Sequence, residues 1–399
     1  GFREPVRGLL AVSTTQTVPC GYDVTQKDAD GAPCRFRVRF LADVAPMSVS
    51  VYEIVPAEKE TVSCAFTYEN NILTTPFYEV TFSEGGICRI LDRKTGRSLI
   101  ENGENGMLFA GIINDTPEVS HGTWQVHCRP MLAEARFYGH IGPIPCRLTL
   151  SFTQDSPLIA CHAEFDHSGE TIGYGRTFAA FRDNTNGFVQ EEKLRFLFTV
   201  PFDKPYHAVR DLPFLIAPTK EPYIQGNYWT AVGTDTQGMA VFNRGAMCLT
   251  CEAQQTFSVP LAYDNRYAWG QKCLWGTYTH EFALRPVIGP LDTLALHKEA
   301  LAYTYPLIAH TIKEDQTGVS SDTILPITLS ESVILSTCYQ KGDATYLRVY
   351  EAGGINGSVS VDGYLLIECD LLENETEQPV QTASFAPRQV KTYRLQSAK

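Results

Sequence analysis

The sequence predicts an all-β chain made of antiparallel sheet, and three observations support this prediction. Short runs in which apolar and polar residues alternate recur along the whole chain, and each run is bounded by Gly, Pro, Asn or Asp. Helical spacing of apolar residues is found mainly in one segment close to residue 300. No internal repeat of fixed period is present, which disfavours a propeller or a solenoid.

The predicted strands follow one another in short segments. The stretch FYEVTFSEGGICRILDRKTGRSLI, from Phe77 to Ile100, predicts a meander of a strand, a Gly-Gly break, a second strand, a Lys-Thr-Gly turn and a third strand. The clearest alternating runs in the chain are Arg35–Phe40, Phe77–Phe82, Arg147–Phe152, Leu194–Val200, Tyr346–Tyr350 and Val390–Leu395.

One helix is expected, over Asp292–Tyr303, with Asp292 as its N-cap. Prolines flank it, and the composition changes to Thr, Ser and Asp between residues 311 and 323, so we expect a domain boundary at about residues 300–325. A charged link, Pro56–Thr61, predicts a second boundary. The 399 residues therefore divide into residues 1–60, a small β-sandwich part, residues 61–305, a large β domain, and residues 306–399, a C-terminal β-sandwich.

Charge and composition exclude several classes of partner. The formal net charge is -12, so a phosphate backbone is repelled and no nucleic acid is expected as a partner. No apolar run is long enough to cross a bilayer, and no membrane partner is expected. The 12 cysteines are scattered, which favours buried thiols in a reducing compartment and a cytoplasmic location.

Three short motifs suggest metal binding, and for each a structural role explains the residues better. Cys248 and Cys251 form a C-x-x-C pair without a second pair, as expected for two thiols of one strand. The segment SHGTWQVH, with His121, Trp124 and His127, has no third ligand at a suitable spacing and is expected at a junction of a loop and a strand. His280-Glu281 lies on an apparent strand and lacks the second His of a zinc helix.

The segment from Tyr263 to Trp269, YDNRYAW, is the best candidate for ligand binding. It interleaves aromatic rings, which stack on the apolar faces of sugar rings, with polar groups that bond to sugar hydroxyls. An ordinary surface loop with one anchored Trp is the alternative. The candidate substrate-binding residues are Tyr263, Asp264, Asn265 and Arg266, and we expect Arg266 to donate hydrogen bonds to sugar hydroxyls.

Several blocks of sequence, taken in order, resemble the C-terminal half of the α-mannosidases of glycoside hydrolase family 38. The resemblance covers nearly the whole chain, although each block by itself is only a pattern of strands and turns. The blocks are Val44–Tyr52, Thr75–Ile100, Glu192–Phe198, Met239–Gly245, Thr279–Pro286, Tyr346–Gly354, Cys369–Glu373 and Phe385–Leu395.

The resemblance implies a fold and a role. The fold is an antiparallel supersandwich of the galactose-mutarotase type, over residues 61–305, flanked by smaller β-sandwich domains. In this family the zinc ion and the carboxylate nucleophile belong to an N-terminal α/β domain, which this chain lacks. The resemblance therefore implies a non-catalytic β region that is inactive by itself and carries no cofactor. It scaffolds the catalytic domain of the same polypeptide and helps to bind a mannoside.

Two positions depart from the family pattern, and two other functions remain open. Glu192 stands where the family has His, and Arg244 stands where it has Asp, which puts a direct role of these positions in doubt. The chain could instead be a stand-alone carbohydrate-binding module. It could also be a mutarotase-type epimerase, which needs a His acid and a carboxylate base within reach of one sugar.

Overall fold

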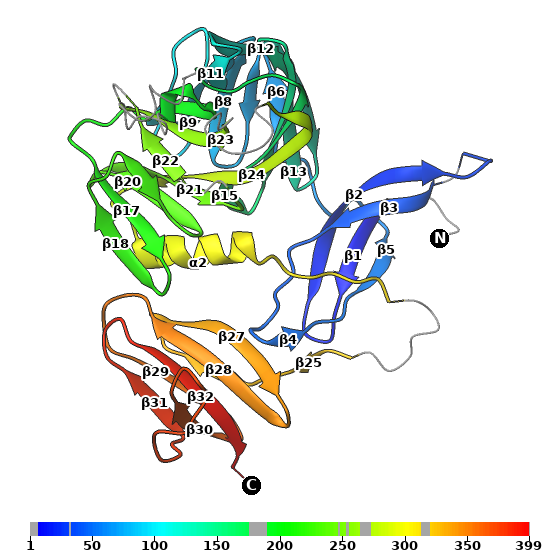
Figure 1. Ribbon diagram of the computed structural model, residues 1–399. Coiled ribbons are helices and arrows are strands. Elements are labelled where there is room, and N and C mark those ends of the chain that lie inside the picture. Colours follow the sequence, from blue (N-terminus) through cyan, green and yellow to red (C-terminus); the bar gives the residue numbers. More distant parts are fainter. Residues whose placement is uncertain are drawn as a thin grey trace.

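The computed structural model describes residues 7–31, 33–174, 190–245, 248–252, 255–263, 273–312 and 320–398. Figure 1 shows an N-terminal sheet in blue, a large central body running from cyan to yellow-green, and a C-terminal body in orange and red. The described residues are almost entirely β, and every sheet is antiparallel, so the predicted fold class is confirmed.

The N-terminal sheet has four strands in the order β3-β2-β1-β5. Its small core consists of the buried side chains of Leu9, Ala11 and Cys20 and of partly buried neighbours. The short strand β4 leaves this sheet and pairs with β25, which precedes the C-terminal body. The bounds are β1 Gly8–Val12, β2 Thr17–Lys27, β3 Pro33–Arg39, β4 Ser48–Val49, β5 Glu53–Ala57 and β25 Asp322–Thr323.

The predicted meander is present as part of a five-stranded sheet in the order β10-β9-β8-β7-β6. The turn between β9 and β10 is closed by Asp92, whose carboxylate accepts hydrogen bonds from the backbone N–H and the hydroxyl of Thr95 at 2.8 and 2.6 Å. The bounds are β6 Thr67–Glu69, β7 Ile72–Thr74, β8 Tyr78–Ser83, β9 Gly86–Asp92 and β10 Ser98–Glu101.

The central body is dominated by a 14-stranded sheet in the order β18-β17-β20-β21-β24-β15-β14-β13-β12-β11-β16-β23-β22-β19. Its edge strands, β18 and β19, are consecutive in sequence: β18 ends at Thr219 and β19 begins at Tyr223. So short a link keeps the two edges close together, and the sheet curls until it is nearly closed. The bounds are β11 Phe109–Ile113, β12 Thr116–Arg129, β13 Leu132–Ile141, β14 Ile144–Thr153, β15 Ser156–Ser168, β16 Leu194–Thr199, β17 His207–Leu212, β18 Leu215–Thr219, β19 Tyr223–Gln225, β20 Trp229–Gly233, β21 Gln237–Asn243, β22 Cys248–Cys251, β23 Thr256–Ala262 and β24 Trp275–Ile288.

The meander and the 14-stranded sheet share one core, which makes the two sheets a supersandwich. Val80 and Ile90 of the meander are fully buried in the same cluster as Phe137, Phe165 and Phe196 of the large sheet. Burying an aromatic or aliphatic side chain of this size stabilises the fold by about 1.5–3 kcal/mol. The meander is therefore the second layer of the central body, as the resemblance implied.

The C-terminal body is a sandwich of a three-stranded sheet, β26-β29-β31, and a four-stranded sheet, β27-β28-β32-β30. Its core contains Leu347, Val359, Leu366 and Phe385. The bounds are β26 Ile327–Leu329, β27 Val333–Lys341, β28 Ala344–Glu351, β29 Gly357–Val361, β30 Tyr364–Cys369, β31 Thr382–Phe385 and β32 Val390–Ser397.

The predicted helix is confirmed as α2, Thr293–Thr304, which lies between the central body and the C-terminal sandwich (Figure 1). Asp292 is its N-cap and accepts a hydrogen bond from the backbone N–H of Ala295 at 3.0 Å. The helix packs Leu296 and Ala300 against Trp229 of β20. Among the described residues, no helix is long and apolar enough to cross a membrane.

One expectation about the motifs was wrong. His121, Trp124 and His127 lie inside the long strand β12 and not at a junction of a loop and a strand. Trp124 joins β12 to the meander: its indole N–H donates to the carbonyl of Ser83 at 2.9 Å, and its ring packs on Phe82. The two histidines are exposed and lie about 20 Å apart along the strand, too far to share a metal ion.

Candidate functional site

Tyr263, the first residue of the predicted sugar-binding segment, lies at one end of the large sheet. Three stretches of chain meet at this end, residues 167–174, 190–195 and 273–280, and with Tyr263 they form what we call the rim. Backbone hydrogen bonds hold two of the stretches together: Gly169 N–H donates to Leu274 O at 2.9 Å, and Leu274 N–H donates to Glu170 O at 3.1 Å. Asp264, Asn265 and Arg266 lie outside the described residues.

Two neighbours fix the ring of Tyr263. The ammonium group of Lys193 lies 5.4 Å from the ring centroid, within the range of a cation–π contact. On another side the backbone of Gly173 comes so close that a Cβ there would lie 3.0 Å from the ring, and its φ of +96° also favours glycine. The start of the predicted segment is therefore anchored to the rim.

Glu192, one of the two departures from the family pattern, also belongs to the rim. It is 5% exposed, and its carboxylate accepts a hydrogen bond from the backbone N–H of Tyr174 at 3.3 Å. Burial lowers the pKa of the adjacent Lys193. The carboxylate of Glu192 holds the backbone N–H of Tyr174, whose ring is exposed.

Exposed aromatic rings give the rim a surface suited to sugars. Trp275 is 56% exposed and Tyr278 39%, although both belong to the paired strand β24. The indole of Trp275 lies over Gly169, where a Cβ would come within 2.6 Å of the ring. Rings held in this way can stack on the apolar face of a pyranose. The sequence analysis missed these two residues, because nothing in a strand pattern shows which aromatic side chains face solvent.

Two histidines, His167 and His280, also belong to the rim. His167 of β15 is buried, and among the described residues neither of its ring nitrogens nor Nε2 of His280 on β24 has a hydrogen-bond partner. Burial lowers the pKa of both imidazoles, so both are neutral near pH 7. His167 packs edge-to-face on Tyr278, with ring centroids 5.4 Å apart.

The carboxylate nearest to His167 is poorly placed to act as a base. Glu170 Oε2 lies 3.8 Å from Nδ1 of His167, and both Glu170 oxygens accept hydrogen bonds from Ser168 at 2.7 Å. Burial alone would raise the pKa of Glu170, but these hydrogen bonds outweigh it and the pKa is lowered. Because the His167 side chain has no exposed surface, this pair does not offer the acid and base of a mutarotase-type epimerase to a sugar in solution.

The other departure from the family pattern, Arg244, has a structural role. Its guanidinium forms an ion pair with Glu281 at 2.8 Å, donates to the carbonyl of Tyr303, and lies 4.4 Å from the Tyr303 ring centroid. The hydrogen bond from Arg244 lowers the pKa of Glu281. These contacts join β21 and β24 to the C-terminal end of α2. His280-Glu281 lies on the strand β24, as the sequence analysis expected.

The C-x-x-C pair lies on β22, as expected for a strand. Cys251 Sγ and the hydroxyl of Tyr206 share a hydrogen bond, and Cys248 Sγ lies 3.8 Å from the Thr250 hydroxyl. In the part of the chain that the structure describes, no three His, Cys, Asp or Glu side chains come together as a metal site.

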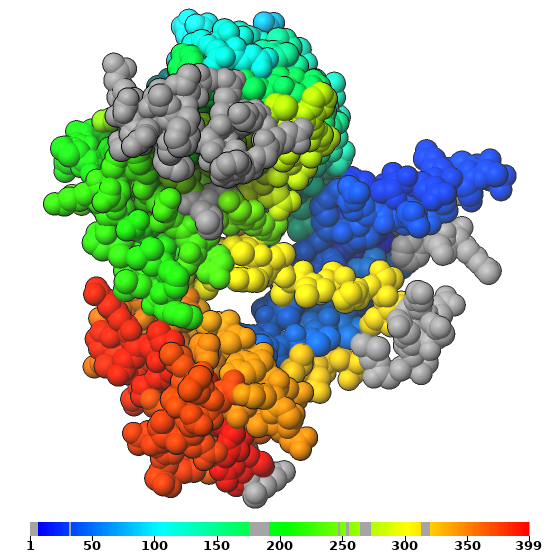
Figure 2. Space-filling view, in the orientation of Figure 1, coloured from blue at the N-terminus to red at the C-terminus, as the bar shows by residue number. Residues whose placement is uncertain are grey.

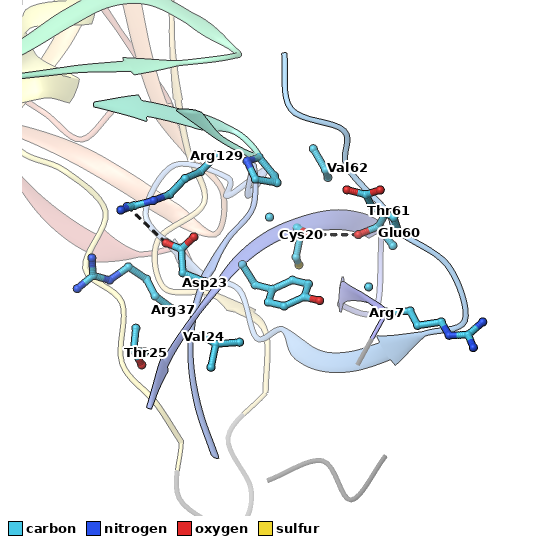
Figure 3. A pocket seen from close by; sticks show the side chains of 14 residues that line it. Arg7, Cys20, Asp23, Val24, Thr25, Arg37, Glu60, Thr61, Val62 and Arg129 are labelled. Atoms are coloured by element: carbon cyan, nitrogen blue, oxygen red, sulfur yellow. Dashed lines mark hydrogen bonds and ion pairs between the residues drawn. The ribbon is translucent and has the colours of Figure 1, made fainter. Parts of the chain in front are cut away.

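A separate pocket of about 720 Å³ lies between the N-terminal sheet and the turn from β12 to β13 (Figure 3). Asp23 forms ion pairs with Arg39 and, at 3.6 Å, with Arg129. Arg129 also forms an ion pair with Glu134 at 3.2 Å. At Gly21, a Cβ would lie 2.7 Å from the carbonyl of Pro130, so the two sheets touch. The charges of this pocket hold the N-terminal sheet on the central body.

Comparison with solved structures identifies two proteins that share this fold along almost the whole chain. One is an α-mannosidase from Enterococcus faecalis V583, with a TM-score of 0.67, 14% identity, and coverage of 99% of this chain and 51% of that protein. The other is a protein of glycosyl hydrolase family 38 from Enterococcus faecalis, with a TM-score of 0.69, 14% identity, and coverage of 99% and 53%.

The likeness to these two proteins confirms the resemblance to family 38 at the level of the fold. The chain spans about half the length of each of them. No family model matches the sequence. No curated protein matches it either.

Proposed function

We propose that this chain is the C-terminal, non-catalytic β region of a zinc-dependent glycoside hydrolase resembling the α-mannosidases of family 38. In this role it scaffolds an N-terminal catalytic domain of the same polypeptide, which carries the zinc. It also contributes the segment that begins at Tyr263 to the binding of a mannoside. A cytoplasmic location is part of the same proposal.

The observation that carries the proposal is the agreement of fold over 99% of the chain with two such proteins. The N-terminal sheet, the supersandwich, α2 and the C-terminal sandwich are all included in the match. A partial match would be uninformative, since supersandwiches occur in proteins of many functions. A match of the whole arrangement, together with the ordered blocks of sequence, supports descent from one kind of enzyme.

The rim supports the contribution to sugar binding. Its exposed rings, Trp275 and Tyr278, and the anchored Tyr263 lie at one end of the sheet, together with buried polar groups that fix the backbone. Sites that combine aromatic rings with a few oriented polar groups are typical of sugar binding. The scaffold keeps these rings in place, because Trp275 and Tyr278 lie on β24, which pairs with β15, and Tyr263 directly follows β23, which pairs with β16.

Replacing Arg266 with Ala in the full enzyme tests the assignment of the segment. We expect kcat/KM for an α-mannoside to fall about 10- to 100-fold, which corresponds to the loss of one charge-assisted hydrogen bond to the sugar. Thermal stability should not change. Arg89→Ala, at an exposed position of β9, is the matched control and should leave the kinetics unchanged. Unaltered kinetics in Arg266→Ala would remove the segment from the site.

A stand-alone carbohydrate-binding module is the second candidate function, and the exposed Trp275 specifically favours it. The isolated 399-residue chain should then bind a mannoside by itself, and Trp275→Ala should abolish this binding. Titration followed by tryptophan fluorescence measures both. A chain that binds no mannoside alone while the full enzyme requires Arg266 would leave only the first candidate.

A further inference from the structure

A second pocket, of about 440 Å³, lies where the β17–β18 hairpin and α2 meet the C-terminal sandwich, and we call it the junction pocket. Figure 2 shows the green surface of the hairpin close to the orange and red surface of the sandwich. Among the described residues that line the pocket, none is Asp, Glu, Lys or Arg. Pockets of this size, at an interface between two structural units, are typical of small-molecule sites.

Four aromatic rings line the junction pocket in two pairs. Phe214 and Tyr350 pack edge-to-face with centroids 5.4 Å apart, and Tyr228 and Tyr305 do so at 5.8 Å. Phe214 has a φ of +64° in the two-residue turn between β17 and β18, a position that favours Gly or Asn. A bulky residue is strained in this conformation, so placing a ring over the pocket has a cost in stability.

Tyr350 lines the pocket, and the hydrogen of its hydroxyl is available for a hydrogen bond to a ligand. The indole N–H of Trp229 can only donate, and it donates to Nδ1 of His297 at 3.0 Å, so the hydrogen of this neutral imidazole is on Nε2. Nε2 lies 2.6 Å from the hydroxyl oxygen of Tyr350 and donates to it. The hydroxyl hydrogen of Tyr350 makes no other hydrogen bond among the described residues, although the side chain is only 5% exposed.

Other neutral polar groups surround the same space. The hydroxyls of Tyr228 and Tyr305 lie 2.9 Å apart and share one hydrogen, so the other hydrogen has no acceptor among the described residues and can bond to a ligand. The carboxamide of Asn227 and the hydroxyl of Ser336 also line the pocket, and neither side chain bonds to another described residue. Ser336 lies at an irregularity in the pairing of β27 with β28, which turns its side chain out of the regular ladder.

We propose that the junction pocket binds a neutral pyranose sugar. Aromatic rings suit the apolar face of a pyranose, and hydroxyl and amide groups suit its alternating donors and acceptors. Among the described residues of the lining, a phosphorylated or carboxylated ligand would find no cation, and a cationic ligand would find no carboxylate. The inference goes beyond the proposed function, because it needs neither the rim nor a catalytic domain.

Methyl-labelled leucine in the 399-residue chain provides a local probe, since Leu212, Leu301 and Leu335 line the pocket. Methyl α-D-mannopyranoside, methyl α-D-glucopyranoside and methyl α-D-galactopyranoside are titrated separately and followed by NMR. We expect at least one of them to shift these three methyl signals with a saturating curve. Mannose 6-phosphate should bind no more tightly than the neutral mannoside.

Two variants separate the pocket from the rim. Phe214→Gly removes a ring and relieves the backbone strain, and it should weaken binding at the pocket by about tenfold. Tyr364→Ala changes an equally exposed ring on β30 that does not line the pocket, and it should change nothing. Trp275→Ala at the rim should leave the pocket signals intact and abolish only sugar binding at the rim.

Two results would overturn the proposal. In the first, none of the three neutral glycosides moves the pocket methyl signals. In the second, a glycoside binds with the same affinity to the wild type and to Phe214→Gly. Binding that is lost in Trp275→Ala but kept in Phe214→Gly would assign the sugar to the rim, which would refute the junction pocket and support the second candidate function, a stand-alone carbohydrate-binding module.

Discussion

At the scale of single residues, the side chain of His297 joins three parts of the molecule. It belongs to α2, accepts a hydrogen bond from Trp229 of the central body, and donates one to Tyr350 of the C-terminal sandwich. The imidazole can serve both partners only while it is neutral, since the protonated ring has no acceptor. Burial lowers the pKa of His297 to about 4, in agreement with this arrangement.

The neutral His297 predicts a loss of stability in mild acid. Its pKa is about 4 when folded and about 6.5 when unfolded, so the unfolded state binds the proton first and stability falls as the pH drops from about 6.5 toward 4. The loss from this residue should be about 2 kcal/mol between pH 7 and pH 5. Urea unfolding at the two pH values measures it.

The variant His297→Gln provides the comparison. It should be less stable than the wild type at pH 7 but should lose about 2 kcal/mol less on going to pH 5. His310→Gln, in the exposed segment after α2, should behave like the wild type. Equal pH dependence in the wild type and in His297→Gln would show that this residue does not control the junction.

At the scale of elements, α2 depends on a short-range signal at its start. The carboxylate of Asp292 accepts the backbone N–H of Ala295, which the first turn of a helix otherwise leaves unpaired. We expect Asp292→Ala to lower the free energy of unfolding by about 1 kcal/mol. Asp235→Ala is the control, since Asp235 is exposed and its ion pair with Lys204 is 4.0 Å long. Equal destabilisation of the two variants in urea would contradict the role of the cap.

Local signals explain why the elements could be predicted from the sequence. The meander has a Gly-Gly break and a turn at Asp92, and α2 has a cap and helical spacing, so each is encoded within a few residues. The order of the 14 strands could not be predicted in the same way, because the pattern of residues in a strand does not show which other strand pairs with it. The long strand β12 was missed for a related reason: its exposed and partly buried residues resemble those of a loop.

Of the four predicted sugar-binding residues, Tyr263 lies among the described residues and belongs to the rim, whereas Asp264, Asn265 and Arg266 lie outside them. The other rim residues come together through long-range pairing: β15 runs beside β24, with Phe165 opposite Tyr278 and His167 opposite Gly276. No spacing in the sequence relates these positions, since they are brought together by the closing of the sheet. Besides Tyr263, the sequence drew attention to Glu192 only as a departure from a family pattern, and to His280 only as half of a zinc motif.

At the scale of the whole molecule, the three groups of strands have very different cores. The supersandwich buries a large cluster that includes Phe137, Phe165 and Phe196, whereas the N-terminal sheet buries little beyond Leu9, Ala11 and Cys20. Stability therefore differs between the parts, since burial of apolar surface is the main stabilising contribution.

Hydrogen–deuterium exchange should reveal this difference. We expect the amides of β1 to β3 to exchange through openings of low free energy, and those of β13 to β15 to exchange only in global unfolding. Exchange followed by mass spectrometry under native conditions measures both sets in one sample. Equal protection of the two sets would mean that the N-terminal sheet unfolds together with the supersandwich.

The central claim is that this chain is the β region of a larger, zinc-dependent enzyme. Determining the coding sequence upstream of Gly1 tests it most directly. The account predicts an in-frame α/β domain with a His-x-Asp zinc motif, followed by a helical segment. A start codon immediately before Gly1 would contradict the account, and sugar binding by the chain alone would then become the leading explanation.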